Sequence, residues 1–94
     1  MKVYISCPIT SNGIKIARVL IEQAKLTLLK HGYKPISPLE ICPYEDTYEH
    51  YMGRDIEALL NCDAVYFVRG WNESKGCKLE YRAAEIYDKK MMFE

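Results

Sequence analysis

The chain has 94 residues, with 13 basic and 13 acidic side chains and therefore no formal net charge when histidine is neutral. A chain of this length forms one domain, so we expect residues 1–94 to fold as a single unit with a thin core. The balanced charge argues against a nucleic-acid polymer as partner, because such surfaces carry a basic excess or a basic stripe.

The four cysteines are widely spaced and contain no CxxC pair, so they do not resemble a zinc module. The sequence starts with a strand-like run rather than an apolar signal segment, and no apolar run is long enough to span a membrane. We therefore expect a cytoplasmic protein with reduced thiols, no metal or other cofactor, and no membrane contact. A thin core also favours self-association as a homodimer or a larger homo-oligomer.

The first half of the chain predicts a strand, a helix and a second strand. Lys2–Ser6 is a short run of β-branched and aromatic residues. A helix is expected from Ile14 to just before Gly32, a residue type that favours a helix end. Tyr33–Ser37 predicts a strand at a sheet edge, because Pro35 cannot donate a ladder hydrogen bond. The expected apolar stripe of the helix consists of Ile16, Ala17, Leu20, Ile21, Ala24 and Leu28.

The second half continues the alternation of helices and strands after a loop that contains two prolines. We expect a loop over Pro38–Asp46 and then a helix that is capped by Asp46 or Thr47 and ends near Asn61. A strand over Ala64–Val68 and a turn over Arg69–Glu73 follow. The last expected elements are a helix over about Lys75–Asp88, capped by Ser74, and a strand over Lys90–Phe93.

Strands that alternate with helices of this length predict an α/β fold with a parallel sheet and helices on both faces. We expect a flavodoxin-like three-layer sandwich with a four-stranded parallel sheet in the order 2-1-3-4. Ligands of such sheets bind beyond the carboxyl ends of the strands, where the strand order reverses. Here that point lies between the first and third strands, next to Ser6–Gly13 and Arg69–Gly76.

Each of the two later helices carries a carboxylate where an apolar side chain is expected. Asp55 and Glu80 both fall on the apolar side of their helix, and a buried carboxylate is costly unless it is paired or used. Two carboxylates directed at one crevice suit acid–base or nucleophilic chemistry. Alternatively, each caps a loop amide or pairs with Arg54, Arg69 or Arg82. The apolar neighbours are Tyr48, Tyr51, Met52, Ile56 and Leu59 for Asp55, and Cys77, Ala83, Ala84 and Tyr87 for Glu80.

The expected crevice has further candidate side chains around it. Ser74 and Gly76 begin a helix whose free N–H groups can hold a phosphate, although a serine at this position is most often a structural cap. Trp71 can stack on a base or ring, pack under its own loop, or pack in a dimer contact. Tyr4 can reach the same place, or serve only in the core. Cys77, in the first turn of the helix, is better explained as a small buried residue than as a reactive thiol.

The motifs VYISCPIT (3–10), RD (54–55), CDAVYFV (62–68) and WNESKGCKLEY (71–81) together resemble the nucleoside 2-deoxyribosyltransferase-like superfamily, and within it the short DUF4406 branch. The resemblance covers nearly the whole chain and depends on the combined spacing of the motifs. Characterised relatives, namely nucleoside deoxyribosyltransferases and 2′-deoxynucleoside 5′-monophosphate N-glycosidases, cleave the bond between base and deoxyribose.

The resemblance implies that Glu80 is the nucleophile at C1′ and that Asp55 orients or protonates the departing base. Tyr4 would be the tyrosine near the nucleophile, and Ser74 with Gly76 the turn that binds sugar or phosphate. Among the residues that border the crevice, we expect the substrate to be bound by Ser6, Arg69, Trp71, Ser74 and Gly76.

The expected function is therefore that of an N-glycosidase or deoxyribosyltransferase acting on a deoxynucleoside or its 5′-monophosphate. An inactive module that binds a small nucleotide is the alternative, because Cys7 replaces the glycine usual in the first loop of the short branch. A structural domain whose two carboxylates are satisfied by loop amides is a third possibility.

Overall fold

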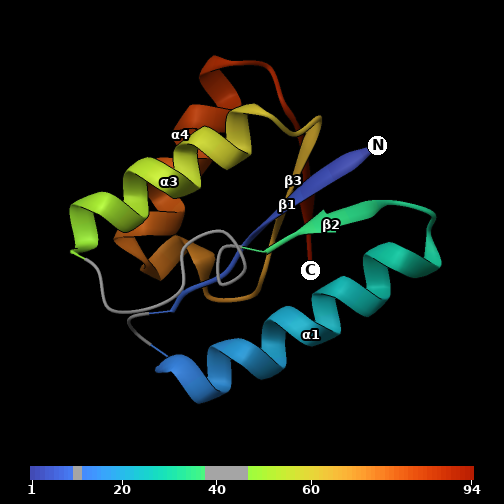
Figure 1. The fold of residues 1–94 in the computed structure, drawn as a ribbon, viewed down its shortest axis with the longest axis horizontal. Helices are drawn as coiled ribbons and strands as arrows, with labels where there is room; N and C mark the ends of the chain where they lie inside the picture. Colours follow the sequence, from blue (N-terminus) through green and yellow to red (C-terminus); the bar gives the residue numbers. More distant parts are fainter. Residues whose placement is uncertain (10–11, 38–46) are drawn as a thin grey trace.

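The computed structural model describes residues 1–9, 12–37 and 47–94. Its strands form one parallel sheet in the order β2-β1-β3-β4, which is the order that the sequence predicts (Figure 1). The strands are β1 (Lys2–Ser6), β2 (Lys34–Ile36), β3 (Ala64–Phe67) and β4 (Lys90–Phe93). The helices are α1 (Ile14–Lys30), α3 (Tyr48–Leu60), η1 (Trp71–Glu73), which is a short 3₁₀ helix, and α4 (Lys75–Ile86).

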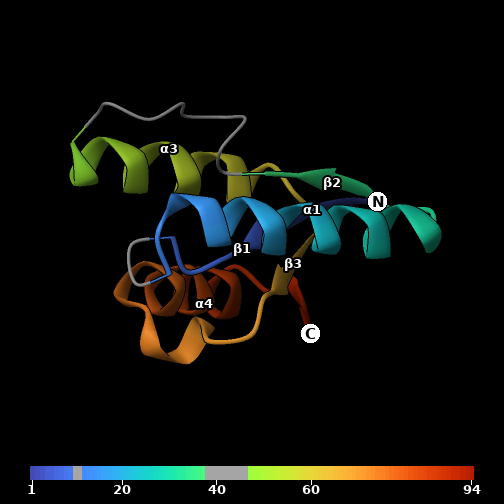
Figure 2. The same ribbon diagram turned by 90° about the horizontal axis from the view of Figure 1, so that it is seen from below.

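Helices cover both faces of the sheet and complete three layers. α1 lies on one face, whereas α3 and α4 lie together on the other (Figures 1 and 2). Alternate residues of β1 therefore enter two different cores, because successive side chains of a strand point to opposite faces. Val3 and Ile5 pack under α1, and Tyr4 packs with Leu59 and Ala84 under α3 and α4.

Local signals in the sequence place the ends of the helices. The Thr47 side chain accepts a hydrogen bond from the His50 N–H at 3.2 Å and so caps α3. Gly32, with φ of 81°, follows the last turn of α1 as expected. Pro35 lies in the edge strand β2, opposite Val3. Asp46, the alternative cap of α3, and the expected loop Pro38–Asp46 lie outside the described residues.

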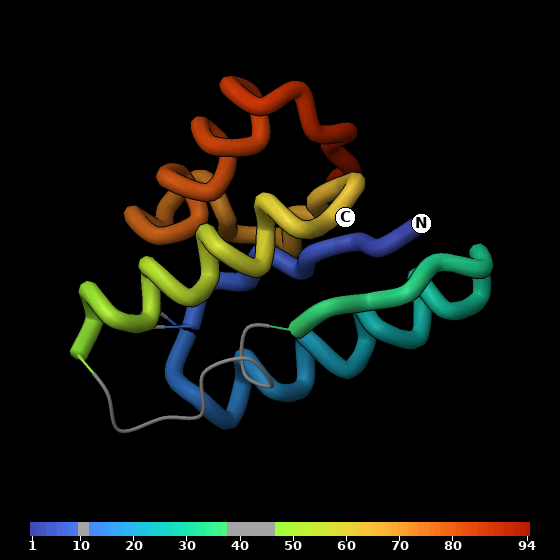
Figure 3. The backbone as a smooth tube through the Cα atoms, turned by 45° about the horizontal axis from the view of Figure 1, so that its top comes forward, coloured from blue at the N-terminus to red at the C-terminus, as the bar shows by residue number. Residues whose placement is uncertain are grey.

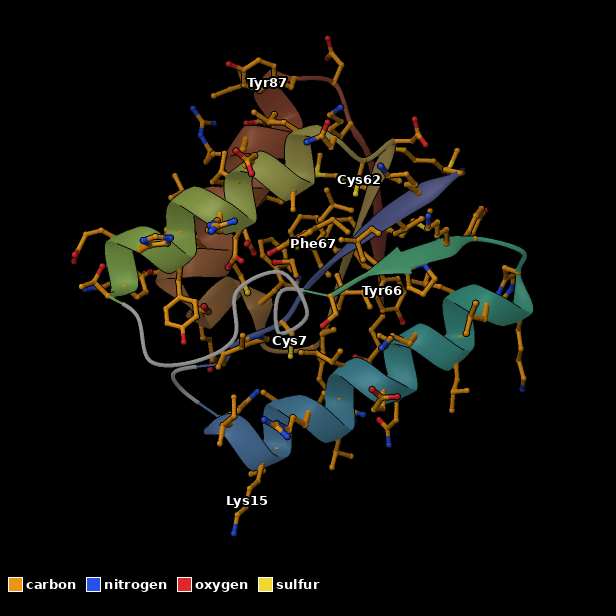
Figure 4. All side chains as sticks on the ribbon, in the orientation of Figure 1. Cys7, Lys15, Cys62, Tyr66, Phe67 and Tyr87 are labelled. Carbon is orange, nitrogen blue, oxygen red and sulfur yellow. The ribbon has the colours of Figure 1, made fainter. Side chains whose placement is uncertain are left out.

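Three expected core residues are exposed instead. Tyr48, at the first position of α3, is 51% exposed. Ile16 is 57% exposed because the buried stripe of α1 consists of Ala17, Ile21, Ala24 and Leu28, and Ile16 lies one residue outside that stripe. Tyr87 is 61% exposed because α4 ends at Ile86 and Tyr87 is its C-cap, where the helical spacing no longer applies (Figure 4). The errors at Ile16 and Tyr87 come from extending a periodic pattern by one position.

Candidate active site

Two hydroxyl side chains of β1 point toward α3 and α4. Tyr4 and Ser6 are two residues apart, so they share a face of the strand, and both are fully buried. The backbone between them is held on both sides, since Tyr4 pairs with Ile36 of β2 and with Val65 of β3. The strand therefore presents two hydroxyls at a fixed spacing near its carboxyl end.

Glu80 extends from α4 to both of these hydroxyls. The Tyr4 hydroxyl donates to Oε2 at 2.7 Å, and the Ser6 hydroxyl donates to Oε1 at 2.6 Å. Both distances lie within the usual range for O–H···O hydrogen bonds. Glu80 reaches the sheet because Cys77, Glu80 and Ala84 form the buried side of α4 at helical spacing.

The surroundings of Glu80 shift its proton affinity strongly. Burial raises the pKa of Glu80 to about 8, the hydroxyls of Ser6 and Tyr4 lower it, and the charge of Asp55 raises it. The pKa of Tyr4 is raised well above its ordinary value, first by burial and then by the charges of Glu80 and Asp55. Tyr4 therefore stays protonated and donates, whereas Glu80 exchanges its proton close to neutral pH.

Asp55 brings a second carboxyl group to this place from α3. The side chain is 8% exposed, and its Oδ1 atom is buried without a hydrogen-bond partner in the described structure. Burial raises the pKa of Asp55 to about 7, and interaction with the Tyr4 hydroxyl opposes that rise. A buried carboxylate oxygen without a partner is costly, and a ligand that supplies a donor would relieve that cost.

The structure therefore gathers four of the predicted site residues, Tyr4, Ser6, Asp55 and Glu80, into one buried group, which we call the carboxylate cluster. The sequence predicts that Ser6 binds the substrate, but it does not predict the hydrogen bond from Ser6 to Glu80. The alternation of side chains along β1 was the available signal, because it places Ser6 on the same face as Tyr4.

The arginines that the sequence offers as alternative partners contact other groups in the described residues. Arg54 donates to His50 at 3.3 Å, and Arg82 pairs with Glu85 at 2.6 Å. Arg69, a predicted substrate-binding residue, forms an ion pair with Glu94 at 3.1 Å, and its backbone N–H also donates a hydrogen bond to the Glu94 carboxylate. In the described residues, the hydrogen-bond donors to Glu80 are therefore hydroxyl groups and not arginines.

Ser74 and Gly76 have packing roles at the start of α4. The Ser74 hydroxyl accepts a hydrogen bond from the Cys77 N–H at 3.3 Å and caps the helix. A Cβ atom added at Gly76 would lie 3.2 Å from the Met52 sulfur and 3.4 Å from the Tyr48 hydroxyl. Glycine at this position therefore lets α3 approach α4, and the two helices run side by side (Figure 3). The expected contact of Ser74 and Gly76 with a phosphate stays a prediction.

Cys77 is a buried residue of this region, as the sequence favours. Its side chain is 2% exposed, and burial raises the pKa of the thiol to about 11, which disfavours the reactive thiolate. The nearby hydroxyl groups of Ser6 and Ser74 lower the pKa of this thiol and so act in the opposite direction. Thr10 and Ser11, which belong to the expected rim, lie outside the described residues.

Trp71 packs under its own loop, one of the three roles that the sequence leaves open. Its ring stacks on Tyr81, with centroids 5.0 Å apart, and contacts Phe67 and Phe93 at 5.1 and 5.6 Å. We call these four residues the aromatic cluster. The Trp71 ring already has an aromatic neighbour on one face. Stacking of Trp71 on a base stays a prediction.

Two classes of site find no support in the described part of the chain. No group of three or more His, Cys, Asp or Glu side chains there could hold a metal ion. Among the same residues, no helix has the length and apolar character needed to cross a membrane.

Comparisons with known proteins agree with the fold. The family model described as "Domain of unknown function (DUF4406)" matches residues 1–93. No curated protein matches the chain in sequence. A solved 2-deoxyribosyltransferase from the psychrotolerant bacterium Bacillus psychrosaccharolyticus is similar in structure, with a TM-score of 0.75 and 20% sequence identity over 99% of this chain and 71% of that chain. The chain thus belongs to the DUF4406 family and has a 2-deoxyribosyltransferase-like fold.

Proposed function

We propose that this protein cleaves the bond between base and deoxyribose in a deoxynucleoside or its 5′-monophosphate. The observation that supports this most is the Glu80 carboxylate, which is buried, held at both oxygens, and close to a second carboxyl group. Carboxylates placed in this way are suited to reaction at an anomeric carbon. The likeness in fold to a 2-deoxyribosyltransferase is consistent with this chemistry.

In the proposed reaction, a carboxylate oxygen of Glu80 attacks C1′ of the sugar. A glycosyl ester forms while the C1′–N bond breaks, and the bond electrons leave with the base. Asp55 donates its proton to the departing base and becomes a carboxylate. A water molecule or a second base then attacks C1′, releases Glu80, and returns a proton to Asp55. Water gives hydrolysis, and a second base gives transfer.

The two carboxyl groups must be in opposite protonation states for this reaction. Glu80 has to be ionised and Asp55 protonated, although burial raises their pKa values to about 8 and about 7 respectively. Because burial raises both pKa values toward neutral pH, the reactive combination and the reverse one are both populated there. Activity should pass through a maximum between pH 7 and pH 8, set by the pair rather than by either residue alone.

The test is a search for free base released from a panel of deoxynucleosides and their 5′-monophosphates, detected by chromatography. We expect release by the wild type and none above background by Glu80→Ala. Glu85→Ala is the matched control, because Glu85 lies on the same helix and pairs with Arg82 on the surface. Base release that persists in Glu80→Ala would refute the proposed mechanism, and no release from any substrate would refute the proposed activity.

Burial of Glu80 also favours a second candidate function, which is nucleotide binding without turnover. With a pKa of about 8, Glu80 is mostly protonated at pH 7 and is then a donor rather than a nucleophile. A protein of this kind would show a rise in melting temperature with a deoxynucleotide and no free base after long incubation. Melting temperatures unchanged by the whole panel would rule out this alternative.

A further inference from the structure

The contact between Ser6 and Glu80 assigns Ser6 a role that its sequence position does not indicate. We propose that Ser6 is a positioning residue, whose hydroxyl holds Oε1 of Glu80 so that the carboxylate keeps one orientation as it attacks the sugar. Ser6 acts through Glu80 and does not bind the substrate. The kinetic part of this inference rests on the proposed function, whereas the orientation of Glu80 can be tested without it.

The first argument is the hydrogen-bonding capacity of Ser6. A serine hydroxyl has one proton to donate, and Ser6 donates it to Glu80 at 2.6 Å. The side chain is also fully buried. A substrate acceptor would have to displace Glu80 to receive the same proton, and that contact would remove the support of the nucleophile.

The second argument is the geometry of the two donors. Tyr4 and Ser6 lie at alternate positions of one strand, and they donate to different oxygens of the same carboxyl group. A single donor would leave the carboxyl plane free to turn about the bond to the rest of the side chain. Two donors at a spacing set by β1 fix that plane, and fixed groups lose less entropy on reaching the reactive geometry.

The third argument is that the backbone of β1 does not depend on the Ser6 hydroxyl. The Ser6 carbonyl accepts a hydrogen bond from the Val68 N–H at 2.9 Å, and Ser6 is in register with Phe67 of β3. Alanine at position 6 keeps both features. A change in Glu80 on replacing Ser6 would therefore report the lost hydroxyl rather than a displaced strand.

The direct test is the titration of Glu80 by carbon NMR in protein labelled at the glutamate carboxyl carbon, with the Glu80 signal assigned by its absence in Glu80→Gln. Other titratable groups around Glu80 are Tyr4 of β1, Asp55 of α3 and Cys77 of α4, and all three stay in place in the variants. We expect Ser6→Ala to raise the Glu80 midpoint by about one pH unit, since a hydrogen bond to the charged form is lost.

Two further variants at position 6 complete the test. Ser6→Thr keeps the hydroxyl and should restore the wild-type midpoint. Ser6→Cys keeps the side-chain volume but has a weak donor, so it should raise the midpoint and replaces Ser6→Ala if alanine prevents folding. A midpoint within about 0.3 pH units of the wild type in the variants without a hydroxyl would overturn the proposal.

Kinetics then separate positioning from binding, using a substrate found by the base-release assay. Positioning predicts that Ser6→Ala lowers kcat about tenfold or more with little change in KM. An increase in KM with unchanged kcat would mean that Ser6 contacts the substrate and would overturn the proposal. If no substrate is cleaved, the proposed function fails, and the NMR titration still decides whether Ser6 positions Glu80.

Discussion

Replacing Glu80 by glutamine should flatten the dependence of stability on pH. The substitution keeps the length and shape of the side chain but removes its titration. Burial raises the pKa of Glu80 from 4.5 to about 8, so the folded protein holds this proton at pH values where the unfolded chain has released it. The folded state then binds more protons, and the free energy of unfolding falls as pH rises through this window.

The size of this effect follows from the shift. A rise from 4.5 to about 8 corresponds to about 5 kcal/mol as an upper limit, at roughly 1.4 kcal/mol per pKa unit. Domains of this size have a stability of about 5–15 kcal/mol, so the contribution is large enough to measure. Asp55, with a pKa raised from 3.8 to about 7, adds a second slope of the same sign. The decrease in stability caused by Asp55 ends near pH 7. Glu80 is therefore the main cause of the decrease between pH 7 and pH 8.

The assay is urea unfolding of wild type and Glu80→Gln at several pH values between 5 and 8. Wild-type stability should fall by about 1.4 kcal/mol between pH 7 and pH 8 at most, and the variant should change little over that interval. Below pH 7, the free energy of unfolding of the variant should fall with pH about half as steeply as that of the wild type. Glu85→Gln, which alters an exposed ion pair on the same helix, should follow the wild type within about 0.5 kcal/mol.

Parallel stability curves for wild type and Glu80→Gln across this range would refute the reasoning. Such a result would mean that Glu80 titrates near its ordinary pKa and that the two hydroxyls fully offset its burial. A wild-type curve that rises with pH would be a stronger contradiction, because it would require a depressed pKa for Glu80.

Two further substitutions test predicted substrate contacts outside the carboxylate cluster. Trp71→Ala should lower the free energy of unfolding by about 2 kcal/mol, because it removes the ring that packs on Phe67 and Tyr81. Urea unfolding measures this change, and an unchanged stability would contradict the packing role. Arg69→Ala should change stability by less than about 1 kcal/mol, because its ion pair with Glu94 is exposed. A rise in KM for 5′-monophosphates alone would show that Arg69 also contacts the substrate, whereas equal KM values would limit it to the ion pair.

The sequence by itself determined the elements and their order. Thr47, Ser74 and Gly32 mark helix ends through local geometry, and Pro35 marks an edge strand because it lacks a donor. The alternation of strands and helices then limits a right-handed parallel sheet to very few orders. The burial of Asp55 could be anticipated in the same way, because helical spacing places it on an apolar side.

Only the tertiary structure decided which side chains meet. Ser6 and Glu80 are 74 residues apart, and their contact depends on the distance between α4 and β1, which no local pattern encodes. The same holds for Trp71, whose neighbours come from β3, α4 and β4. Residue types and spacing predict which groups are buried, but the partner of each buried polar group depends on how the layers pack. For Glu80 that packing supplies two hydroxyl donors in place of an arginine.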